Sequence, residues 1–80
     1  MHDMKKYIPE EVLVEVLKVL DFGNTKHPGE NWKKQSEITH LWHALGHIFH
    51  YLFIGKKDEE TQCSHLAHAI CRLMFAMGRK

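Results

Sequence analysis

The sequence lacks the long apolar run, the strong charge and the glycine-rich loops that mark several common protein classes. No stretch approaches the ~20 apolar residues that span a bilayer. The formal net charge is only +1 with histidine counted as neutral, which is too small to attract nucleic acid or an anionic membrane. Neither a phosphate-binding glycine loop nor a dinucleotide-binding fingerprint occurs. We therefore expect no membrane partner and no specific nucleic-acid partner.

Cysteine is scarce as well, since Cys63 and Cys71 are the only two in the chain. Eight residues apart on one helix, they would lie about 12 Å from each other, which is beyond the reach of a disulfide. They fall at apolar helical positions that suit packing better than nucleophilic attack. We therefore expect two buried thiols, a reducing compartment and a cytoplasmic location.

Histidine, by contrast, is abundant, with eight residues among 80. Their summed charge should rise steeply as the pH falls through roughly 6.5. The length and the 44% hydrophobic content fit one globular domain over residues 1–80. A chain this short buries only about 60–65% of its unfolded surface, so we expect it to gain stability as a homo-oligomer.

Apolar periodicity and helix-ending residues predict an all-α fold with three helices. Pro9 and Ser36 suit the beginnings of helices, and Gly23, Gly55 and Gly78 suit their ends. The predicted helices span residues 9–22, 36–54 and 61–77.

Two connections join these helices. The first, residues 23–35, is long and rich in turn-forming residues, and such ordered loops are often functional. We interpret Trp32 within it as an anchor on the helices, with a base-stacking surface as the alternative. The second, residues 56–60, is short and predicts an antiparallel pair of helices.

The periodicity also predicts which helix faces meet the core. The stripes expected to face the core are Val12, Leu13, Val16, Leu17 and Leu20, then Ile38, Leu41, Trp42, Leu45, Ile48, Phe49 and Leu52, then Leu66, Ile70, Leu73 and Met77. The polar groups expected on the opposite, outward sides are His40, His43, His47 and His50, then His65, His68 and Arg72. We therefore expect the histidines to face away from the core.

Three interpretations of this histidine face remain open. It can be a subunit interface or a hydrated surface, because small alanines lie among its polar residues. It can be a metal site, with imidazoles three or four residues apart and nearby Asp58, Glu59 or Glu60 as ligands. It can also be an anion pocket, in which histidines, Arg72 and lysines of the long loop meet phosphate oxygens.

Short motifs follow one another from about residue 7 to residue 77. They are Ile8-Pro9-Glu10, Leu20-Asp21-Phe22-Gly23 with Lys26 and Asn31-Trp32, Ala44 with His47, Gly55, Asp58 with Glu60, and His65-Leu66-Ala67-His68-Ala69. In this order they resemble the small phage and bacterial proteins called dATP/dGTP diphosphohydrolase-like. The chain departs from that pattern where Gly46 replaces an arginine before His47, His27 replaces a tyrosine, and Thr61-Gln62 replaces Ser-Gly.

The resemblance implies an all-helical relative of the MazG-like nucleotide pyrophosphatases, encoded by a phage and working in the host cytoplasm. Its substrate would be a purine nucleotide, and its cofactor a divalent metal, Mg²⁺ or Mn²⁺ in preference to Zn²⁺. The implied catalytic residues are Asp58, Glu60 and His47, and the implied metal ligands are Asp58, Glu60, His65 and His68. The expected nucleotide-binding residues are Lys26, Asn31, Trp32, His65, His68 and Arg72.

Two functional hypotheses follow, and they differ in turnover. In the first, the protein hydrolyses a purine nucleoside triphosphate to the monophosphate and pyrophosphate. In the second, it is an inactive oligomeric protein that sequesters a nucleotide immune signal of the host, because Gly46 removes a cation that would stabilise charge on phosphate. A helical oligomer without any small ligand is a third alternative.

Overall fold

The computed structural model describes residues 6–26, 29 and 31–78. Within these residues the chain forms α1 (Glu10–Lys26), the short 3-10 helix η2 (Asn31–Lys34), α2 (Glu37–Phe53) and α3 (His65–Gly78). The three α-helices confirm the predicted all-α fold. An isolated antiparallel bridge between Lys57 and Ser64 closes the α2–α3 connection.

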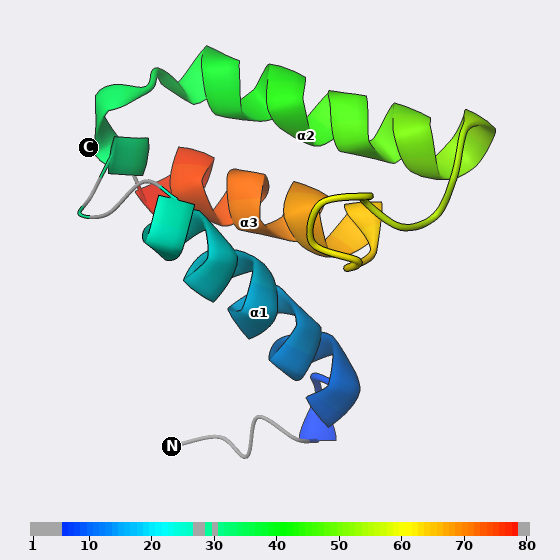
Figure 1. Ribbon diagram of the computed structural model, residues 1–80. Helices are drawn as coiled ribbons and strands as arrows, with labels where there is room; N and C mark the ends of the chain where they lie inside the picture. The colour runs from blue at the N-terminus through cyan, green and yellow to red at the C-terminus, as the bar shows by residue number, and fades with distance from the viewer. Residues whose placement is uncertain (1–5, 27–28, 30, 79–80) are drawn as a thin grey trace.

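The three helices are arranged with α3 in the middle (Figure 1). On one side α2 lies antiparallel to α3, as the short connection predicts, and on the other side α1 crosses α3. The hydrophobic core lies between α1 and α3. It consists of Val16, Val19, Cys63, Ala67 and Cys71, with Leu20 and Phe75 packed against it.

Helix α1 continues four residues beyond its predicted end, so Gly23 lies inside the helix. A Cβ at Gly23 would meet no other atom within 4 Å, so no close contact requires a glycine at this position. The Thr25 hydroxyl donates to the Asp21 carbonyl one turn earlier, within the added turn. This extra turn carries Lys26 to the α2–α3 connection.

Helix α3 begins at His65, four residues later than predicted. The Thr61 backbone N–H donates to the Asp58 carboxylate, and Gln62 has a φ of 61°, which no right-handed helix allows. Ser64 caps the helix instead, because its hydroxyl accepts from the Leu66 N–H. In α2, by contrast, Ser36 is the N-cap as predicted and accepts from the Thr39 N–H.

The faces of α2 and α3 are in part the reverse of those predicted, although His43 and His50 are exposed as predicted. His40 is completely buried and His65 is nearly so, whereas the apolar stripe of α2 is largely exposed, Trp42 by 66%. Leu66, Ile70, Leu73 and Met77 of α3 are exposed as well. Despite this apolar surface, none of the helices in the described part of the chain is long and apolar enough to cross a membrane.

Small side chains and hydrogen-bonded imidazoles account for this reversal. Ala44 on α2 and Ala69 and Ala76 on α3 are buried, and small residues let two helices approach closely. The histidine rings between the helices are hydrogen-bonded, and no buried side-chain nitrogen or oxygen among the described residues lacks a partner. A buried histidine whose ring nitrogens are hydrogen-bonded avoids the free-energy cost of burying an unpaired polar group. The spacing of apolar residues does not show such bonds, so it places these histidines on the outside.

Candidate functional site

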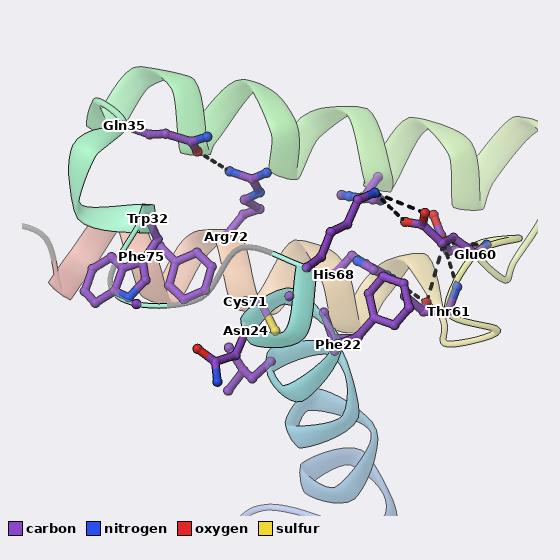
Figure 2. A pocket seen from close by; sticks show the side chains of 17 residues that line it. Phe22, Asn24, Trp32, Gln35, Glu60, Thr61, His68, Cys71, Arg72 and Phe75 are labelled. Carbon is purple, nitrogen blue, oxygen red and sulfur yellow. Dashed lines mark hydrogen bonds and ion pairs between the residues drawn. The ribbon is translucent and has the colours of Figure 1, made fainter.

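A cavity of about 400 Å³ opens between the end of α1, η2, the α2–α3 connection and α3 (Figure 2). Its volume lies within the range of small-molecule sites. Residues from every element line it: Val19, Leu20, Phe22, Gly23, Asn24 and Lys26 of α1, then Gly29, Trp32 and Gln35, then His47 of α2, then Asp58, Glu60 and Thr61, and His68, Cys71, Arg72 and Phe75 of α3.

One stripe of α3 forms the floor of this cavity. His68, Cys71, Arg72 and Phe75 follow the spacing i, i+3, i+4 and i+7, which places them on a single helix face. From His68 to Phe75 this stripe extends about 10 Å along the helix axis. Burial raises the pKa of the Cys71 thiol to about 11, so this thiol stays protonated and serves packing.

Arg72 is held near the middle of the stripe by two hydrogen bonds. Its Nη1 donates to Gln35 Oε1 at 2.6 Å and to His40 Nδ1 at 3.1 Å. Because arginine only donates, His40 Nδ1 accepts, and the His40 proton lies on Nε2. That Nε2–H donates to the Trp32 carbonyl at 2.8 Å. Both described bonds of Arg72 use Nη1, so the guanidinium keeps donors for a ligand.

An aromatic pair forms one end of the cavity, next to Arg72. The rings of Trp32 and Phe75 stack with their centroids 5.0 Å apart and their planes 16° apart. Trp32 therefore anchors its segment on α3, as predicted, and it also lines the cavity. Figure 2 shows this pair at one end of the cavity and Thr61 with Glu60 at the other.

Asp58 organises that opposite end. Its Oδ1 accepts from the backbone N–H groups of Glu60 and Thr61, at 2.9 and 3.0 Å. Burial raises the pKa of Asp58, but these two hydrogen bonds outweigh burial, so the net pKa is lowered and the group is ionised at neutral pH. The Thr61 hydroxyl in turn lies 2.8 Å from His68 Nε2, which links the carboxylate region to α3.

Histidines of α2 and α3 meet behind this end of the cavity. His47 Nδ1 lies 3.0 Å from His65 Nδ1, and the His47 ring stacks on His68 with centroids 4.7 Å apart. Burial, followed by the charges of His68 and His65, lowers the pKa of His47 to about 4. Burial also lowers the pKa of His68, against the opposing effect of Asp58. Both rings are therefore neutral at pH 7.

An ion pair closes the same end of the cavity. Lys26 Nζ lies 3.0 and 3.2 Å from the two carboxylate oxygens of Glu60, and both side chains are about half exposed. Solvent screens such a pair, so it adds little stability and a charged ligand can compete for it. Lys26 can thus turn toward an anion in the cavity.

Most of the predicted site residues meet in this one cavity. Those in its lining are Lys26, Trp32, His47, Asp58, Glu60, His68 and Arg72. His65 lies instead at a neighbouring hollow of about 330 Å³, which also reaches His47 and Asp58 and contains Gly46. Asn31 begins η2, but its side chain lies outside the described part of the structure. Its role stays a prediction.

Three residues of this region that were not predicted as site residues make contacts in or beside the cavity. Gln35 was placed in the loop and carried no distinctive pattern, yet it binds Arg72. Thr61 was predicted to begin the third helix and to depart from a family motif, whereas its N–H donates to Asp58 and its hydroxyl contacts His68. His40 was predicted on the outer face but is buried. Its burial depends on hydrogen bonds to Trp32 and Arg72, which the spacing of apolar residues does not reveal.

The carboxylates and imidazoles do not form a metal-binding group as they are arranged. Among the residues that the structure describes, no three His, Cys, Asp or Glu side chains are placed to hold a metal ion. Asp58 Oδ1 already accepts two hydrogen bonds, Glu60 is paired with Lys26, and His68 Nε2 contacts Thr61. We therefore assign no chemical step to a protein-bound metal.

The fold and this cavity define a small helical domain with a polar cavity between its helices. A family described as dATP/dGTP diphosphohydrolase, N-terminal, matches residues 3–79. The chain therefore belongs to this family, which confirms the resemblance in the sequence. No curated protein and no solved structure matches the chain.

Proposed function

We propose that the chain binds a purine nucleoside triphosphate of the dATP/dGTP class in the cavity between α1 and α3. The observation that carries this proposal is the cavity lining, where an aromatic pair and the two cationic side chains Lys26 and Arg72 share one hollow of about 400 Å³. The family match supports the substrate class. The two buried free cysteines fit work in a reducing cytoplasm, that of a bacterial host in the case of a phage protein.

In this proposal the two ends of the cavity bind different parts of the nucleotide. The Trp32–Phe75 pair offers an apolar surface to the purine base. Arg72, held by Gln35 and His40, donates to a phosphate oxygen with its remaining N–H groups. Lys26 leaves Glu60 for the phosphate chain and supplies a second cation.

In the hydrolytic form of this proposal, the reaction occurs at the Asp58 end of the cavity. Water would attack the α-phosphorus, the bond from that phosphorus to the bridging oxygen would break, and pyrophosphate would leave. Asp58, Glu60 or the neutral His47 would accept the water's proton. We propose that Mg²⁺ or Mn²⁺ would enter only with the triphosphate, and the two carboxylates that line the cavity are the protein anions near it.

The same carboxylates favour a second candidate function, binding without turnover. Asp58 and Glu60 are engaged by backbone N–H groups and by Lys26, and they do not form a metal-binding group in the described structure. A protein of this kind would sequester a nucleotide or a nucleotide-derived signal intact. The two functions share the cavity and differ only in the product.

Calorimetric titration with dATP and dGTP tests the shared proposal. The Arg72→Met variant should bind at least tenfold more weakly, because a charge-assisted hydrogen bond contributes about 1.5–3 kcal/mol. Lys18→Met removes one positive charge from an exposed position on α1 outside the cavity and should bind as the wild type does. Equal affinities for all three proteins, or no binding by the wild type, would refute the proposal.

Incubation with the nucleotide and Mg²⁺ or Mn²⁺, followed by denaturation and chromatography, separates the two functions. Recovery of the monophosphate and pyrophosphate would establish the hydrolase. Recovery of intact nucleotide from a protein that binds it would establish sequestration.

A further inference from the structure

The outer face of α2 carries a continuous apolar seam that no other part of the described chain covers. Ile38, Trp42, Leu45, Phe49 and Leu52 make up this outer seam, and each is 54–66% exposed. Their spacing alternates between four and three residues, which is the repeat of helices that pair along their length. Figure 1 shows α3 on one side of α2 and no other helix on its opposite side.

The exposed apolar area of this seam is close to the area that each partner buries in a stable dimer. Five large side chains exposed by more than half amount to roughly 600–700 Å² of apolar surface, against about 800 Å² per partner in a standard interface. The neighbouring Phe53, which is 72% exposed, enlarges the patch further. The core of a single chain is small, so burying this seam would add substantially to its stability.

We propose that a second copy of this chain covers the outer seam, with the two α2 helices antiparallel about a twofold axis near Leu45. An uncharged seam is complementary to itself, which a symmetric interface requires. The antiparallel arrangement opposes the two helix dipoles favourably. This interface leaves the cavity between α1 and α3 open.

Analytical ultracentrifugation of matched variants tests this interface. We expect the wild type to be a dimer at micromolar concentration and Leu45→Glu to raise the dimer dissociation constant at least 100-fold. The control is Leu17→Glu on α1, because Leu17 is 49% exposed and Leu45 is 54% exposed. Leu17→Glu should remain a dimer. A monomeric wild type, or dissociation by Leu17→Glu but not by Leu45→Glu, would overturn the proposal; circular dichroism verifies that each variant keeps its helices.

Cysteine cross-linking tests the orientation. In an antiparallel pair, Ile38 of one copy faces Leu52 of the other. A mixture of Ile38→Cys and Leu52→Cys proteins should therefore form disulfide-linked dimers, whereas Ile38→Cys alone should not. The native Cys63 and Cys71 are buried and interfere little. Efficient cross-linking of Ile38→Cys with itself would overturn the antiparallel arrangement.

Discussion

His40 joins three parts of the molecule through one side chain. The residue belongs to α2, its Nε2–H donates to the Trp32 carbonyl in η2, and its Nδ1 accepts from Arg72 of α3. Its ring is also 5.4 Å from that of Phe75. One completely buried imidazole therefore fixes both the aromatic pair and the guanidinium that line the cavity.

Removing this side chain should be costly. We expect His40→Ala to lower the free energy of unfolding by about 2–4 kcal/mol, because it removes the hydrogen-bond partner of the Trp32 carbonyl and one of the two acceptors of Arg72, and opens a void. Urea denaturation monitored by circular dichroism measures the change. His43→Ala, an exposed position on the same helix, should cost less than about 1 kcal/mol. Similar losses for both variants would contradict the role of His40.

At the scale of elements, α1 is attached to the rest of the chain mainly through α3. Val16 and Val19 supply its core contacts, and Cys71 lies near the Val16 carbonyl. In addition, Glu15 accepts a 2.6 Å hydrogen bond from the Ser64 N–H at the beginning of α3. This carboxylate satisfies a backbone donor and lies at the positive end of the α3 dipole.

The Glu15 contact should therefore hold the two helices together. We expect Glu15→Ala to lower the free energy of unfolding by about 1–3 kcal/mol, since a hydrogen bond to a charged group is lost and the Ser64 N–H is left unpaired. Guanidinium denaturation measures the effect. Glu11→Ala removes the same charge from an exposed position on α1 and should cost less than half as much. A larger loss for Glu11→Ala would show that charge on α1, and not this contact, is what matters.

At the scale of the whole molecule, the histidines between α2 and α3 make stability depend on pH. The pKa of His47 is lowered to about 4 by burial and by neighbouring His68 and His65, with Asp58 opposing them. Between about pH 6.5 and pH 4 the unfolded chain therefore binds more protons than the folded chain does. Stability contributed by the neutral ring is present above pH 6.5 and is lost as the pH falls toward 4.

Acidification should accordingly weaken the fold well above the pH at which carboxylates titrate. We expect His47 to contribute a loss of about 1–2 kcal/mol between pH 7 and pH 4.5, because solvent reaches part of the ring and screens its charge. Urea denaturation at a series of pH values measures the slope. His47→Gln should flatten it, and an unchanged slope would contradict the assigned pKa.

The sequence predicted the number and type of the helices but not their exposed faces. Ser36 and the spacing of apolar residues located α2 within one residue at each end. The last residue of α1 was predicted too early because Gly23 lies within the helix. The first residue of α3 was also predicted too early, because the Asp58 carboxylate accepts from the Thr61 N–H and holds Thr61 in a turn. Part of each face was reversed because the stripe rule assumes that apolar residues meet the core of their own chain.

The candidate site was predicted more fully than the packing. Motif order pointed to Lys26, Asp58, Glu60 and His68, and the structure brings these residues to one cavity although they come from three segments. The supporting contacts could not be derived, because His40 and Gln35 act through hydrogen bonds between distant elements. Periodicity and spacing carry no information about such bonds.

The two tryptophans lie in different surfaces of the molecule. Trp32 stacks in the wall of the cavity, whereas Trp42 belongs to the outer seam of α2 and is 66% exposed. Replacing either indole with phenylalanine leaves the other as a single fluorophore. The intrinsic emission of this protein can therefore follow occupancy of the cavity and pairing of chains as two separate optical signals.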